Sequence, residues 1–133
     1  VLIELINNLL IGACQLLVQR GYNLYATEGT AKYLVDNEVP AERVIWPTEA
    51  TNPELAGKYK AAMDMLANKE LDLVINIPKN FSTGELTNGY HVRRAAIDYN
   101  IPLITNARLA TAFIRAFCAM SIDDIQIKSW DQY

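Results

Sequence analysis

Histidine and cysteine are scarce in this sequence, and their scarcity excludes several kinds of catalytic and metal site. The 133 residues include one histidine, His91, and two cysteines, Cys14 and Cys118. A zinc site draws three or four such ligands together, so none is expected. Both cysteines fall in apolar helical patterns, which favours buried, reduced thiols over a disulfide. His91 is expected in the first turn of an exposed helix, where a catalytic role is disfavoured.

A surplus of positive charge and a long apolar run are also missing. Twelve Lys and Arg against 15 Asp and Glu give a net charge of -3, which provides no basic surface for nucleic acid. The apolar segment 1–17 is interrupted by Glu4, Asn7, Asn8 and Gln15 and is too short to span a bilayer. No Walker-type or dinucleotide glycine pattern occurs. We therefore expect a protein that binds neither nucleic acid nor a membrane, and the two buried, reduced cysteines favour an intracellular one.

Strand-like and helix-like segments alternate along the whole chain. Strands are expected at 1–3, 22–26, 43–46, 71–77 and 102–105, and helices at 8–20, 30–37, 53–68, 89–99 and 107–120. This alternation predicts an α/β fold of three layers, with a five-stranded, mainly parallel sheet flanked by helices. The length suits one domain, residues 1–133. Because the sequence starts abruptly inside a strand, we expect it to be a fragment of a longer polypeptide.

Parallel sheets bind ligands beyond the carboxyl ends of their strands, and polar residues gather there in this sequence. The turn Thr27-Glu28-Gly29-Thr30 precedes a helix whose expected N-cap is Thr30, so it offers an anion two hydroxyls and unpaired helix-end amides. Thr30 as a simple N-cap is the competing interpretation. Asn76 ends the most apolar strand, where an unpaired amide is costly, so it holds a neighbouring loop or faces a ligand. No acid–base pair accompanies these residues, which favours a binding site over an active site.

Several stretches together resemble the methylglyoxal-synthase-like domain. These are residues 21–31, residues 71–76, and residues 89–96 with 99–105. They resemble more closely the version at the C-terminus of the carbamoyl phosphate synthetase large chain, an allosteric regulatory domain, over about residues 12–117. The resemblance implies a domain without chemistry or cofactor of its own. It implies a parent ligase that makes carbamoyl phosphate from bicarbonate, ATP, and ammonia or glutamine nitrogen.

The same resemblance implies partners and a location. The partners would be the remaining domains of the synthetase large chain, with a glutaminase small subunit as a further candidate. The parent would act in arginine or pyrimidine biosynthesis or in the urea cycle. Its compartment would be the bacterial cytoplasm or the mitochondrial matrix.

The resemblance also implies which residues bind the effector. Synthetases regulated by nucleotides carry two lysines and a hydroxyl where this chain has Asn7, Trp46 and Pro78. The tryptophan-proline pair after the third strand and the Asn-x-Pro after the fourth are instead similar to the type activated by N-acetylglutamate. By that likeness a small anion such as N-acetylglutamate would be bound by Thr27, Thr30, Trp46, Asn76, Lys79 and Asn88.

Three other interpretations remain open on the sequence. The effector could be a nucleotide such as uridylate or inosinate. The chain could be a lyase of the methylglyoxal synthase type, although residues 56–59 and 76–78 and the position near Asn88 lack the acidic residues and the histidine that such an enzyme uses. The pocket could also be vestigial and the domain an interaction surface.

Overall fold

Six short strands form one parallel sheet in the computed structural model, which describes residues 1–4, 8–78 and 82–133, with only the backbone for Glu85. The strand order is β4-β3-β2-β1-β5-β6, and every pair of neighbours is parallel. The predicted fold class is confirmed, with six strands in place of the five expected. The strands are β1 (Leu2–Glu4), β2 (Tyr25–Ala26), β3 (Glu42–Ile45), β4 (Lys60–Ala61), β5 (Val74–Asn76) and β6 (Leu103–Ile104).

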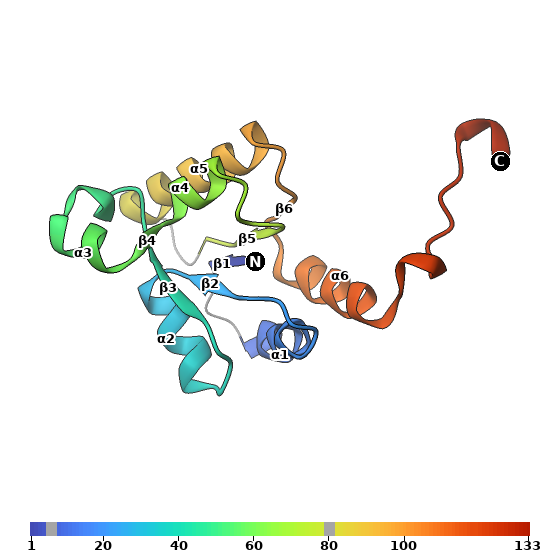
Figure 1. Ribbon diagram of the computed structural model, residues 1–133, viewed down its shortest axis with the longest axis horizontal. Coiled ribbons are helices and arrows are strands. Elements are labelled where there is room, and N and C mark those ends of the chain that lie inside the picture. The colour runs from blue at the N-terminus through green and yellow to red at the C-terminus, as the bar shows by residue number, and fades with distance from the viewer. Residues whose placement is uncertain (5–7, 79–81) are drawn as a thin grey trace.

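Helices cover both faces of this sheet. Figure 1 shows α1, α2 and α6 on one face, α4 and α5 on the other, and a tail from Ser121 that runs away from the body. None of the helices within residues 1–4, 8–78 and 82–133 combines the length and the apolar character that a membrane crossing requires. The helices are α1 (Ile11–Gln19), α2 (Glu28–Asp36), α3 (Pro53–Lys58), α4 (Ala62–Ala67), α5 (Thr83–Asp98) and α6 (Ala107–Ala119), with 3-10 turns at Asn8–Leu10, Glu49–Thr51, Ile122–Asp124 and Trp130–Gln132.

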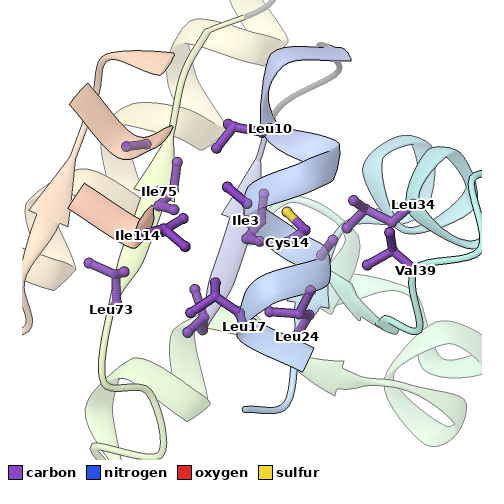
Figure 2. Close-up of a cluster of buried hydrophobic side chains, with 14 of the residues drawn as sticks. Ile3, Leu10, Cys14, Leu17, Leu24, Leu34, Val39, Leu73, Ile75 and Ile114 are labelled. Atoms are coloured by element: carbon purple, nitrogen blue, oxygen red, sulfur yellow. The ribbon is translucent and has the colours of Figure 1, made fainter. Parts of the chain in front are cut away.

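Two hydrophobic cores lie on opposite faces of the sheet. The first packs α1, α2 and α6 against the sheet, and Figure 2 shows its side chains around Ile3 and Ile75. The second packs α4 and α5 against Leu2 and Val74. Alternate residues of β1 and β5 thus enter different cores, as expected for strands buried on both faces. Cys14 and Cys118 are buried and unpaired, which confirms the prediction of buried, reduced thiols.

The prediction of a single helix at 53–68 is wrong, because a short strand divides this segment into two helices. Asn52 caps α3 by accepting the Glu54 N–H at 3.0 Å, and the chain leaves the helix at Tyr59. It leaves because Lys60 and Ala61 pair with the edge of β3 before α4 begins. The added strand therefore arises from a pairing that helical periodicity does not reveal.

The helix expected to begin at Gly89 begins earlier. The Leu86 N–H donates to the Ser82 carbonyl at 3.0 Å, and α5 starts at Thr83 despite the turn-like composition there. His91 therefore lies within the helix and not in its first turn. Its side chain is exposed, as expected. The C-terminal end of α1 agrees with the prediction, because Gly21 follows it with a φ of +86°.

Candidate functional site

The strands β1 and β5 end side by side where the winding of the sheet reverses. The chain proceeds from β1 outward through β2, β3 and β4, then returns to place β5 on the other side of β1. Such a switch point is where open α/β sheets bind ligands. Glu4 and Asn76, the last residues of the two strands, are partners in the parallel register. We call this end of the sheet the carboxyl edge.

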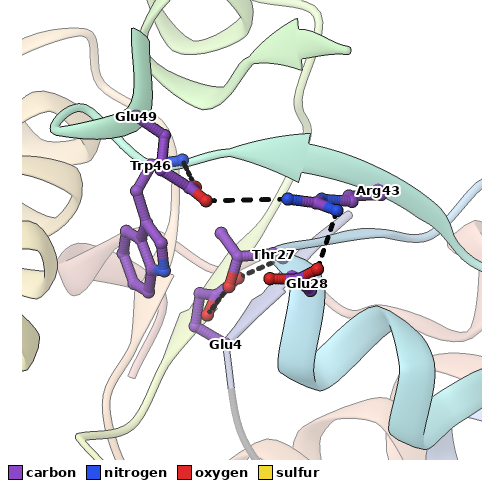
Figure 3. Close-up of polar contacts among 6 residues, drawn as sticks. All are labelled: Glu4, Thr27, Glu28, Arg43, Trp46 and Glu49. Carbon is purple, nitrogen blue, oxygen red and sulfur yellow. Dashed lines mark hydrogen bonds and ion pairs between the residues drawn. The ribbon is translucent and has the colours of Figure 1, made fainter. Parts of the chain in front are cut away.

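Thr27 lies at the start of α2 and binds a carboxylate of its own chain. The helix begins at Glu28, so the N-cap is Thr27, and the prediction that Thr30 is the N-cap is wrong. The Thr27 N–H and hydroxyl donate to the two carboxylate oxygens of Glu4, each at 2.6 Å (Figure 3). Both side chains are buried. Glu4 therefore occupies the helix start at which the sequence predicts the binding of an external anion.

Thr30 lies in the first turn of the same helix. It is completely buried, and its hydroxyl has no hydrogen-bond partner among the described residues. An unmade hydrogen bond of a buried polar group costs about 1–3 kcal/mol. The Thr30 hydroxyl is therefore a buried polar group left unsatisfied at the start of α2 in the described structure.

Asn76 is held by a side chain of α5. Its carboxamide oxygen accepts a hydrogen bond of 2.5 Å from Nη1 of Arg93. Gly89 makes room for this contact, since a Cβ on Gly89 would lie 2.7 Å from that nitrogen and 3.3 Å from the Asn76 oxygen. Of the two expectations for Asn76, a neighbouring loop or a ligand, neither describes this contact. The amide oxygen binds a helix side chain.

Asn88 connects α5 to the loop that follows β3. It is buried, and its carboxamide oxygen accepts the Thr48 N–H at 3.3 Å. The loop that Asn88 holds also carries Trp46, whose half-buried indole packs against the second core. The carboxyl edge thus receives side chains from β1, β5, α2, α5 and the loop after β3.

The backbone of Trp46 is fixed by a charged network, drawn in Figure 3. Glu49 accepts the Trp46 N–H at 2.7 Å and pairs with Arg43 at 3.6 Å. Arg43 also pairs with Glu28 at 2.9 Å and lies 4.5 Å from the centre of the Tyr59 ring. The Glu28 side chain thus points toward Arg43, away from Glu4 and Thr27 (Figure 3).

Five of the six predicted site residues fall in described parts of the chain, and Lys79 lies outside them. Glu4 and Arg93 also belong to this edge, and neither was predicted from the sequence. Glu4 could have been found, because it follows an apolar strand segment just as Asn76 does. Arg93 could not, since its contact depends on how α5 packs and on the space above Gly89. In the described residues no three His, Cys, Asp or Glu side chains gather in a way that could hold a metal ion.

Comparison with known proteins agrees with the fold. The family model described as "MGS-like domain" matches residues 9–105. The chain is 38% identical over 114 residues to the Multifunctional protein CAD of Squalus acanthias, covering 80% of this chain and 5% of that protein. It is 38% identical over 107 residues to the mitochondrial Carbamoyl-phosphate synthase [ammonia] of Homo sapiens, covering 80% of this chain and 7% of that protein.

An archaeal relative extends the similarity. The chain is 30% identical over 123 residues to the Carbamoyl phosphate synthase large chain of Thermoplasma acidophilum, which covers 92% of this chain and 11% of that protein. The chain thus spans a small part, between 5% and 11%, of the length of these three relatives. Since the family model matches most of its residues, the chain belongs to the MGS-like domain family.

Proposed function

We propose that this chain is the effector-binding regulatory domain of a carbamoyl phosphate synthetase large chain, and that its effector is a small acid such as N-acetylglutamate bound at the carboxyl edge. The observation that carries this proposal is the buried hydroxyl of Thr30, which has no partner in the described structure at the start of α2. The similarity to relatives named as carbamoyl phosphate synthases over 80% or more of the chain supports the regulatory assignment.

An acidic effector would make complementary contacts with several groups at this edge. Its carboxylate would accept hydrogen bonds from Thr30 and from the first turn of α2, where the helix dipole favours negative charge. The Trp46 indole would pack on the aliphatic part. The oxygens of Asn76 and Asn88 already accept hydrogen bonds, so their NH₂ groups would donate to the effector. Lys79 would supply a cation.

The proposed domain acts by differential binding and performs no reaction. An effector that binds one state of the parent enzyme better than another shifts the equilibrium between them, typically by about 1–3 kcal/mol of coupling. The remaining domains of the large chain are the partners that would receive this shift. A phosphate carries more negative charge than a carboxylate, and this chain has Asn7, Trp46 and Pro78 where nucleotide-regulated synthetases carry two lysines and a hydroxyl. A nucleotide effector is for that reason the less favoured alternative.

Calorimetric titration of the 133-residue chain with N-acetylglutamate, uridylate and inosinate tests the proposal. Thr30→Val is the informative variant, because the Thr30 hydroxyl has no partner to lose among the residues that the structure describes, so a loss of binding reports a ligand contact. Thr87→Val, an exposed position on α5, is the matched control.

We expect saturable binding of N-acetylglutamate, weakened about tenfold in Thr30→Val and unchanged in Thr87→Val. Binding of a nucleotide alone would support the nucleotide alternative. Binding of none of the three, or equal binding by both variants, would refute the assignment of the effector site. Turnover of dihydroxyacetone phosphate by the chain would instead reveal a lyase.

A further inference from the structure

We propose that Glu4 is an internal competitor of the effector: Glu4 occupies the start of α2, and an acidic ligand displaces it on binding. This inference rests on the proposed function, because it concerns the same site. Glu4 is completely buried, and both of its carboxylate oxygens accept short hydrogen bonds from Thr27. Glu4 therefore accepts the hydrogen bonds that the Thr27 N–H and hydroxyl donate at the start of this helix.

The unpartnered hydroxyl of Thr30 shows that this occupation is incomplete. Glu4 binds the N-cap residue, whereas Thr30 lies three residues further along the same helix and stays without a partner in the described structure. A ligand acid that reached both threonines would satisfy a group that Glu4 leaves unsatisfied. The extra hydrogen bond to Thr30 would therefore favour the ligand acid over Glu4 at this helix start.

Two carboxylates cannot share this helix start at low cost. A ligand acid on Thr30 would lie next to the Glu4 carboxylate in a site that excludes most water, where like charges repel strongly. The repulsion is relieved when the Glu4 side chain leaves Thr27. Binding is then an exchange of one acid for another.

The displaced side chain can move without disturbing the sheet. The Glu4 carbonyl accepts the Ile77 N–H at 2.9 Å, which holds its backbone in place. Glu4 and Asn76 are register partners, so their side chains leave the same face of the sheet. Arg93, bound to Asn76 on that face, offers a cation to the released carboxylate. Effector binding would thus be transmitted to α5 through Arg93.

Glu4→Gln is the variant that tests this competition, and Glu28→Gln is its matched control. Both substitutions remove one negative charge beside the start of α2, but Glu28 is exposed and pairs with Arg43 on the surface. The probes are inorganic sulfate, measured by its shift of the melting temperature, and N-acetylglutamate, measured by calorimetry. Circular dichroism establishes that each variant is folded.

We expect Glu4→Gln to bind both probes about tenfold more tightly than the unchanged chain, the size of effect that one charge has at a partly buried helix start. Glu28→Gln should stay within about twofold. Equal or weaker N-acetylglutamate binding by Glu4→Gln would refute the competition while leaving the proposed function intact. Tighter sulfate binding without any N-acetylglutamate binding would uphold the competition and refute the proposed effector. If no probe binds to any chain, both proposals fail.

A measurement on the unchanged chain keeps the inference testable if Glu4→Gln does not fold. The ¹³C resonance of the Glu4 carboxylate and the Thr27 amide proton report their hydrogen bond directly. Saturation with N-acetylglutamate is expected to shift both resonances and also the Arg93 Nε resonance. Binding that left all three unchanged would show that Glu4 stays on Thr27 and would refute the inference.

Discussion

Glu4 and Asn76 are partners in the register of the two central strands, and each binds a side chain from a different helix or helix start. Glu4 binds Thr27 before α2, and Asn76 binds Arg93 on α5. These contacts join the two helical layers of the domain at the carboxyl edge. A ligand that contacted Glu4 or Asn76 would therefore have to rearrange existing hydrogen bonds.

Thr27→Val should lower the free energy of unfolding by about 2–3 kcal/mol. The substitution keeps the shape of the side chain but removes the hydroxyl that binds the buried Glu4 carboxylate, and hydrogen bonds to charged groups are worth about 1.5–3 kcal/mol. Urea denaturation measures the change. The exposed Thr87→Val control should stay within about 0.5 kcal/mol, and an equally small change in Thr27→Val would mean that the carboxylate does not depend on this hydroxyl.

Gly89→Ala and Gly84→Ala, both in α5, should differ in their effect. Alanine favours a helix over glycine by about 1 kcal/mol, and a Cβ on Gly84 meets no atom within 4 Å, so Gly84→Ala should stabilise the chain. At Gly89 the new methyl group must displace the Arg93 guanidinium from Asn76, which offsets the gain. Thermal denaturation measures both. An equal gain at the two positions would show that Arg93 moves away at no cost.

Glu49→Ala should loosen the loop that carries Trp46 and lower the free energy of unfolding by about 1–2 kcal/mol. It removes the carboxylate that accepts the Trp46 N–H and pairs with Arg43. The readout is Trp46 fluorescence in a Trp130→Phe background. Trp130 is 95% exposed and emits at long wavelength, so its emission would otherwise hide the shift of Trp46. The emission should shift to longer wavelength. The exposed Glu54→Ala should leave it unchanged, and an unshifted spectrum in Glu49→Ala would contradict the positioning of Trp46 by Glu49.

Burial raises the pKa of the Cys14 thiol from its ordinary value of 9.0 to about 12. Between pH 9 and about 12 the thiol is ionised in the unfolded chain but protonated in the folded chain. Unfolding in this pH range therefore releases a proton. Stability should therefore fall as pH rises from about 9 toward 12, by at most about 1.4 kcal/mol per pH unit.

Comparison with Cys14→Ala isolates this contribution from other groups that titrate at high pH. Both chains are denatured with urea at pH 8.0 and 10.5 as chosen conditions, and the loss of stability between them should be smaller in Cys14→Ala. Equal losses would mean that Cys14 ionises as readily in the folded chain as in the unfolded one.

The layers and strands of this domain could be predicted from sequence because apolar runs alternate with helical patterns along the whole chain. The break at Tyr59 could not, since Lys60 and Ala61 form a strand only by pairing with β3. At the site, the sequence placed Thr27 and Asn76 at strand ends correctly. It could not show that Glu4 binds Thr27, because that contact joins two strand ends 23 residues apart.

The alternation of β1 and β5 between the two cores has a consequence for how the domain unfolds. Leu2 and Val74 belong to one core, and Ile3 and Ile75 belong to the other, so neither helical layer can separate without uncovering strands that the other layer needs. Unfolding should accordingly be a single cooperative transition, with the backbone amides of these two strands exchanging with solvent only in the globally unfolded state.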